Sequence, residues 1–239
     1  MFTVPAKFED FLYVGQLLQS EGIKMAIEAH RRAMPFCMGT LFWQIDDCWP
    51  VASWSSIDYY GRWKAQQYMA KKAFEPVIVS PFREGNAIKI YTVSDLYENS
   101  SAILQISLMD FEGKVLRKEE KTIVVPPNTS NVVYTLAEAD WTKNMDRTKT
   151  FISIKLMQNN QELCRNSFFF EKPKNVDLPK ANIQLSKVDD NHIMVSTDKL
   201  ARFIWLELPN SINAFSDNYF DLLPGEQKVL KIKDKYSRD

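Results

Sequence analysis

The spacing of hydrophobic residues changes near residue 75, and this change limits the possible folds more than any other feature of the chain. Before that point apolar residues recur every three or four positions, which is typical of amphipathic helices. From Val77 onward, short apolar segments alternate with turn residues, which is typical of strands. We therefore expect a helical N-terminal part followed by a long β part.

The N-terminal part predicts two helices and, after a long loop, a third. The first helix begins near Pro5 and the second is marked by Ile23 and Ile27, with a break at Ser20-Glu21-Gly22 because Gly is favoured at helix ends. The third is expected over 63–74, where Pro76 ends it.

Between these helices lies the run 38–45, MGTLFWQI, which is almost continuously apolar. Such a run predicts a strand buried on both faces, as in a parallel sheet. A single strand leaves its backbone groups unpaired, so the rest of that sheet is expected from a part of the polypeptide upstream. Helix, buried strand, loop and helix thus resemble the tail of an α/β architecture.

The β part predicts a sandwich, a linker near 172–179 and a smaller second β unit. Turn residues at 112–114, 158–161 and 189–191 separate the expected strands. The strands are expected over 87–93, 103–111, 115–125, 151–157, 162–170, 183–188, 192–197, 202–208 and 228–232.

Composition excludes several classes of function. Thirty basic and thirty acidic side chains leave no net charge for nucleic acid or an anionic membrane. No apolar run approaches the ~18–20 residues that cross a bilayer, so a soluble protein is expected. The N-terminus is not a signal peptide, and the compartment stays open (periplasmic, lysosomal or extracellular if a signal lies upstream). The three Cys and two His lack metal-ligand spacing, so no metal or cofactor is expected.

The stretch 46–62 combines Trp, Asp, Ser and Tyr, and follows the expected strand. Loops after such strands build the sites of α/β proteins, and a sugar needs a flat indole beside hydroxyl-binding carboxylates. A Trp-rich loop is nevertheless more often explained by packing or by a domain–domain contact than by ligand binding, and Trp54 and Trp63 fit packing best. Trp43, at the end of the expected strand, is the better candidate for a site.

Asp46 and Asp47 are adjacent, and this argues against their being the two carboxylates of a glycosidase. Neighbouring side chains on a strand point to opposite faces, whereas a retaining pair must face one sugar across ~5–5.5 Å. One of them can still bind a hydroxyl or fix the loop.

Two stretches resemble one enzyme family. The run 2–74, above all GTLFWQIDDCWPVASWSSIDYYGRWKA, resembles the end of the (β/α)8 barrel of β-mannosidases in glycoside hydrolase family 2. The stretch 215–226, FSDNYFDLLPGE, resembles the closing immunoglobulin-like domain of the same enzymes. The resemblance implies a mixed fold: a C-terminal barrel end over 1–75, an immunoglobulin-like β-sandwich over 76–175, and a small C-terminal immunoglobulin-like domain over 176–239.

The resemblance also implies exo-acting, retaining hydrolysis of terminal non-reducing β-D-mannose. The family's nucleophile lies in a Ser-Glu-Phe-Gly-like motif, which this sequence lacks, so no catalytic residue is expected here and the chain alone should be inactive. Trp43 matches an aromatic residue that lines the terminal-sugar subsite, and Asp46 stands where many relatives have Asn. Asp47 and Trp49 match the Asp-Cys-Trp-Pro core, with site-wall or loop-fixing roles. The expected partners are a β-mannoside and the preceding part of the same polypeptide.

Two alternatives stay open. The chain can be a pair of β-sandwiches that bind glycan or attach to an enzyme, with residues 1–75 a structural remnant. It can also belong to a family 2 exo-glycosidase with another sugar specificity, because selectivity for the axial 2-hydroxyl depends on residues outside this chain.

Overall fold

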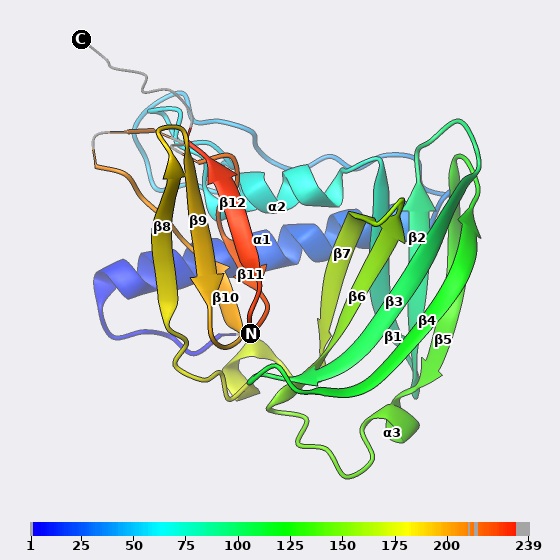
Figure 1. Cartoon of the computed structure of the whole chain (residues 1–239). Coiled ribbons are helices and arrows are strands. Elements are labelled where there is room, and N and C mark those ends of the chain that lie inside the picture. Colours follow the sequence, from blue (N-terminus) through cyan, green and yellow to red (C-terminus); the bar gives the residue numbers. More distant parts are fainter. Residues whose placement is uncertain (1, 210, 213–214, 233–239) are drawn as a thin grey trace. The chain divides into compact units, whose positions relative to one another are not determined.

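The computed structural model describes residues 2–209, 211–212 and 215–232. Met1 and residues 233–239 lie outside the described residues, and with them the outer ends of the expected ranges 1–75 and 176–239. The described chain is mostly β-sheet with few helices (Figure 1). It divides into two compact units: residues 25–40 with 73–177, and residues 2–24, 41–72 with the described residues from 178 onward.

The helices are α1 (Phe8–Arg32), α2 (Ala65–Ala73), the short α3 (Glu138–Trp141) and the 3-10 turn η1 (Pro173–Asn175). The expected break at residues 20–22 is wrong, since α1 runs without interruption for 25 residues. An interior Gly costs only about 1 kcal/mol, and burial of Leu17 and Ile27 on either side of Gly22 outweighs it. The expected helix over 63–74 is confirmed as α2. Among the described residues, none of the helices has the length and apolarity that crossing a membrane requires.

Two antiparallel sheets form the first unit's β-sandwich. Its strands are β1 (Val77–Glu84), β2 (Ala87–Ser94), β3 (Ser100–Asp110), β4 (Val115–Val125), β5 (Thr129–Ala137), β6 (Thr150–Gln158) and β7 (Gln161–Phe169). One sheet has the order β1-β2-β5 and the other β4-β3-β6-β7. The expected strands in this range are confirmed, whereas β1 and β5 were not predicted individually. The polar start of β5, Thr-Ser-Asn, hides its strand pattern.

Strands β3 and β6 contribute to the sandwich core in different ways. In β3, Leu104 and Ile106 are almost completely buried, whereas Gln105 between them lies closer to the surface. In β6, the residues from Thr150 to Ile154 are all buried. The β6–β7 turn places Asn159 and Asn160 at positive φ, which Asn tolerates better than most residues. The sequence pattern and the observed core therefore agree.

The second unit contains the smaller β domain. Its strands are β8 (Ile183–Asp189), β9 (His192–Thr197), β10 (Ala201–Ile204), β11 (Phe220–Leu222) and β12 (Gln227–Lys231). They form the sheets β12-β9-β8 and β10-β11 around a core that includes Val195 and Leu230. The strand expected over 202–208 ends at Ile204. Beyond it, the amide of Asn218 bonds to both backbone groups of Leu206, so a side chain replaces a strand partner.

The strand expected over 38–45 is absent from the part of the chain that the structure describes. These residues are irregular, and Leu41 is 100% exposed where burial on both faces was expected. The reason is that no described strand lies parallel to this run. Only an isolated parallel bridge between Asp46 and Ile57 forms beside it. The expectation of a buried strand was wrong for this chain.

Candidate functional site

The loop 41–64 is irregular but fixed by its own backbone. The amide of Ser56 donates to the carbonyl of Gln44 (3.0 Å), and the amide of Ile57 donates to Ile45 (2.7 Å). The amide of Lys64, just before α2 begins, donates to the carbonyl of Ser56 (2.9 Å). The loop therefore has a defined shape without a regular strand.

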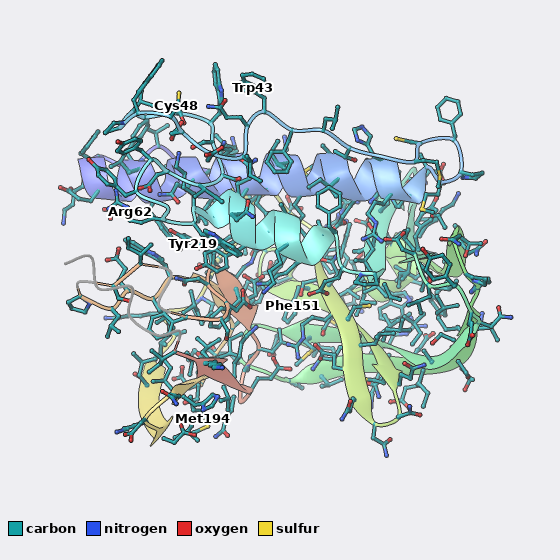
Figure 2. All side chains as sticks on the ribbon, turned by 90° about the horizontal axis from the view of Figure 1, so that it is seen from above. Trp43, Cys48, Arg62, Phe151, Met194 and Tyr219 are labelled. Carbon is teal, nitrogen blue, oxygen red and sulfur yellow. The ribbon has the colours of Figure 1, made fainter. Side chains whose placement is uncertain are left out.

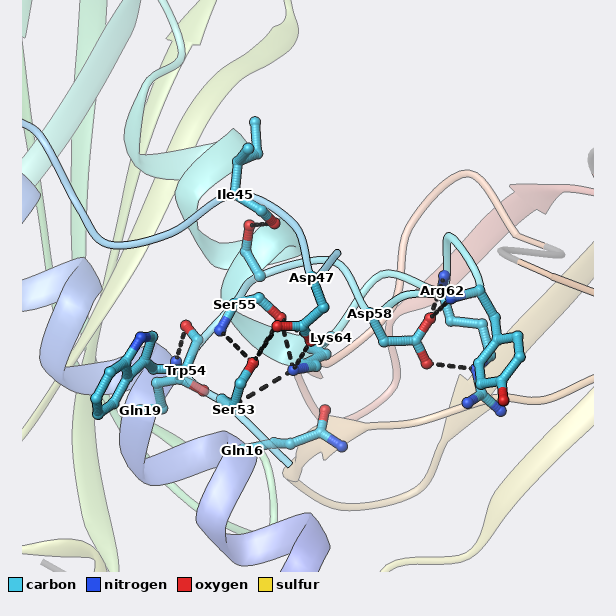
Figure 3. A network of polar contacts seen from close by, with 12 residues as sticks. Gln16, Gln19, Ile45, Asp47, Ser53, Trp54, Ser55, Asp58, Arg62 and Lys64 are labelled. Carbon is cyan, nitrogen blue, oxygen red and sulfur yellow. Dashed lines mark hydrogen bonds and ion pairs between the residues drawn. The ribbon is translucent and has the colours of Figure 1, made fainter. Parts of the chain in front are cut away.

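Asp47 is the centre of a polar network inside this loop (Figure 3). Its carboxylate accepts hydrogen bonds from the hydroxyls of Ser53 and Ser55, both at 2.6 Å. Lys64 Nζ lies 3.6 Å from the same carboxylate and donates to Ser55 Oγ at 2.8 Å. The two serine hydroxyls, together with Lys64, lower the pKa of Asp47, because they favour its charged form.

The hydrogen bonds of this network determine the role of Asp47 in this structure. Its side chain is only 2% exposed, and both carboxylate oxygens are already bonded within the loop. Asp47 thus fixes the loop, and a direct bond from it to a sugar stays a prediction. Its neighbour Asp46 is exposed, so the adjacent carboxylates do not share one environment. This difference supports the argument that they are not a catalytic pair.

The other expected site residues lie on the outside of the loop. The side chain of Trp43 is 73% exposed and points away from α1, as Figure 2 shows, and Trp49 is 62% exposed. Asp46 is exposed as well. The structure therefore places Trp43, Asp46 and Trp49 on the exposed side of one ordered loop, and Asp47 within it. Their role in binding a substrate stays a prediction.

Several residues that fix the loop were not predicted. Ser55 and Ser56 are fully buried, and Ser56 Oγ donates to Gln67 Oε1 of α2 (2.7 Å). Gln19 Nε2 of α1 donates to the carbonyl of Trp54 (2.5 Å). Little in the sequence indicated these contacts, because each joins residues that lie many positions apart along the chain and meet only in the folded loop.

Asp58 closes the second half of the loop. Its carboxylate accepts the backbone amides of Tyr60 and Arg62 (2.9 Å each) and also Arg62 Nε (2.6 Å). Gly61 takes a φ of 80° between them, a value that suits glycine. Asp58 is therefore a turn residue rather than a site carboxylate.

Comparison with known proteins agrees with this architecture. Residues 86–175 match the family model of a mannosidase Ig/CBM-like domain, and residues 178–239 match the Ig-fold domain of mannosidases. β-Mannosidase A of Neosartorya fischeri is 29% identical over 94% of this chain, and β-mannosidase of Capra hircus is 30% identical over 90%. The chain spans 26% of the length of each.

Solved structures give the same result. The crystal structure of β-D-mannosidase from Dictyoglomus thermophilum matches 98% of this chain and 29% of its own, with a TM-score of 0.87 and 28% identity. The exo-chitosanase CsxA of Amycolatopsis orientalis matches 97% of this chain and 32% of its own, with a TM-score of 0.70 and 18% identity, which shows a shared fold alone. The resemblance of this chain to the C-terminal region of the β-mannosidases is thereby confirmed.

Proposed function

We propose that this chain is the C-terminal region of an exo-acting, retaining β-mannosidase, and that its loop 41–64 forms part of the terminal-sugar subsite. The observation that carries the proposal is an exposed indole on a rigid loop: Trp43 is 73% exposed, while Asp47 fixes the loop from within. The similarity to β-mannosidases over most of the chain also supports this proposal.

In this proposal Trp43 stacks on the apolar C–H face of the terminal sugar. Indoles suit this task because they offer a large flat surface at little loss of conformational freedom. Asp46, exposed beside it in sequence, accepts sugar hydroxyls, and Trp49 forms a wall of the subsite. Asp47 contributes by keeping the loop in shape. The acid and the nucleophile of a retaining mechanism come from another part of the longer polypeptide.

Residues 1–75 are proposed to complete the end of a (β/α)8 barrel. Several apolar side chains of the loop and of α1 are exposed, including Leu41 (100%), Ile45 (57%) and Phe8 (67%). Large apolar patches are rare on isolated soluble proteins and mark surfaces that another part of a structure covers. The remainder of the barrel is that cover, and it would also give residues 38–45 the parallel neighbours that a buried strand needs.

An activity assay tests this function. The chain alone is expected to give no turnover of an aryl β-mannoside, because catalysis needs both carboxylates together. The longer polypeptide is expected to hydrolyse the same substrate with retention at the anomeric carbon. Sustained turnover by the chain alone would refute the absence of the catalytic pair. An aryl β-glucosaminide in parallel tests the alternative sugar, and preference for it would replace the mannose specificity.

A further inference from the structure

The small β domain contains an ion cluster that reaches α2. Asp217 Oδ1 lies 3.0 Å from Lys72 Nζ on the last turn of α2, and its Oδ2 lies 2.6 Å from Lys228 Nζ on β12. The carboxylate is 17% exposed. Burial alone would raise the pKa of Asp217, but the two ammonium groups outweigh it and lower that pKa. One carboxylate thus joins helix and sheet.

Tyr219 makes a second connection, two residues further along. Tyr219 is 3% exposed, and its ring lies 5.9 Å from the ring of Tyr68 on α2 and 6.3 Å from that of Tyr13 on α1. Its hydroxyl lies 3.3 Å from Gln16 Oε1, which also accepts the amide of Ala65, the first residue of α2. Tyr219 therefore contacts both helices at the level where α2 begins.

Tyr219 also has an unusual backbone conformation. Its φ is 51°, in the left-handed region that bulky residues rarely adopt. Phe203, whose carbonyl accepts the Tyr13 hydroxyl (2.6 Å), has a φ of 54°. Such conformations persist only where the surrounding structure fixes them, and they are enriched near functional sites. In this domain they gather at the residues that face the helices.

The same helices carry the loop 41–64. Gln67 of α2 accepts from Ser56, Lys64 next to α2 belongs to the Asp47 network, and Gln19 of α1 bonds to Trp54. A continuous set of contacts therefore runs from the small β domain through α1 and α2 to the loop. A shift of either helix would move the loop with it.

We propose that the small β domain is the positioning scaffold of the sugar-site loop, and that Asp217 and Tyr219 are its positioning residues. This inference rests on the proposed function for the meaning of the loop, but the mechanical coupling it states is independent of any sugar. Loss of either contact lets α2 move, which loosens the loop and displaces Trp43 from the sugar.

Hydrogen–deuterium exchange of this chain tests the coupling. In Asp217→Asn and in Tyr219→Phe, amide exchange over residues 44–57 is expected to accelerate about tenfold, because local opening becomes easier. Asp189→Asn is the matched control, because Asp189 accepts the amide of Asn191 and contacts the ring of His192 within the β8–β9 hairpin. Leu230→Ala is the second control, since it weakens the core of the same domain at a residue that is fully buried.

The outcomes separate positioning from general stability. Faster exchange of residues 44–57 in Asp217→Asn and Tyr219→Phe, compared with a Leu230→Ala sample brought by temperature to the same global stability, supports the proposal. Equal acceleration in all three variants overturns it, because the loop would then respond to unfolding of the domain. Unchanged exchange in Asp217→Asn and Tyr219→Phe overturns it as well.

Kinetics of the longer polypeptide give the second readout. In both positioning variants the KM for an aryl β-mannoside is expected to rise roughly tenfold with a smaller change in kcat, because a displaced subsite wall weakens binding of the sugar. An unchanged KM in an active enzyme overturns the proposal. If the unsubstituted polypeptide does not cleave the mannoside, the proposed function fails, and the exchange experiment alone decides the coupling.

Discussion

The sandwich of residues 77–169 and the run 36–60 are both rich in apolar residues, but the sandwich buries many of them whereas the run leaves many exposed. In the sandwich, Ile88, Leu104 and Ile154 are 0% exposed. In the run, Phe36 is 97%, Leu41 100% and Trp43 73% exposed. The sandwich pairs each strand with a neighbour of the same chain, whereas the run has only short irregular pairings.

This difference shows when a hydrophobic pattern predicts a buried strand correctly. Alternation with a period of two describes a strand that has one dry face, and the sandwich supplies that face itself. A continuous apolar run describes a strand that needs partners on both sides and on both edges. When these partners belong to another part of a polypeptide, the run stays exposed. The run is therefore the better indicator of a covering partner.

The largest effect is expected for truncation in the sandwich core. Ile154→Ala should lower the free energy of unfolding by about 2–5 kcal/mol, because it removes buried methyl groups and leaves a cavity. The matched change Ile45→Ala, at a residue 57% exposed, should cost no more than about 0.5 kcal/mol. Urea denaturation of both variants measures the difference. Similar losses in the two variants would contradict the difference between the buried sandwich core and the exposed run 36–60.

The next effect concerns Arg31, which is 7% exposed at the end of α1. Its guanidinium donates to the carbonyls of Ala73 and Glu75 (2.7 Å each) and to Asp95 (2.8 Å). Arg31→Met should destabilise the first unit by about 2–3 kcal/mol, since the buried carbonyl of Ala73 and two partly buried acceptors lose their donor. Arg62→Met is the control, because its guanidinium is 60% exposed and should matter by less than about 1 kcal/mol. Equal denaturation midpoints for the two variants would show that the hydrogen bonds of Arg31 do not stabilise the first unit.

Thiol labelling sharpens the same comparison. Burial raises the pKa of Cys164 to about 12, whereas Cys48 is exposed on the loop. Iodoacetamide at pH 8 should therefore modify Cys48 at least ~10-fold faster than Cys164, because the thiolate is the reacting form and must be accessible. Peptide mass spectrometry reads both rates. In the longer polypeptide Cys48 should become slower if the barrel covers the loop; an unchanged rate there would argue against that cover.

The smallest effect is the pH dependence of the stability that the Asp47 carboxylate contributes. The folded-state pKa of Asp47 is lowered by Ser53 and Ser55, so its contribution to stability is present above the unfolded value of about 3.9 and is lost as pH falls through the folded value. The stability difference between the unsubstituted chain and Asp47→Asn should therefore shrink below about pH 4. Urea midpoints measured from pH 6 to pH 3 test this. A constant difference would show that the charge of Asp47 is not involved.

Much of the sandwich was predictable from sequence, because β3 alternates buried and more exposed residues and turn residues mark the β3–β4 and β6–β7 hairpins. Strand β5 was not predicted, because its polar start hides the strand pattern. Gly22 misled the prediction of α1, since burial on both sides of a glycine outweighs its weak helix propensity. At the candidate site, the separation of Asp46 from Asp47 was predicted. The bonds of Ser53 and Ser55 to Asp47 were not, because they depend on how an irregular loop folds back on itself.

Substitution of two tryptophans in the longer polypeptide tests the central claim most directly. Trp43→Ala is expected to lower kcat/KM for an aryl β-mannoside about 10- to 100-fold, since it removes the surface on which the sugar stacks. Trp54→Ala, which removes another exposed indole of the same loop, is expected to change it less than about threefold. Equal kcat/KM values for Trp43→Ala and the unsubstituted enzyme would contradict the placement of this loop in the sugar site.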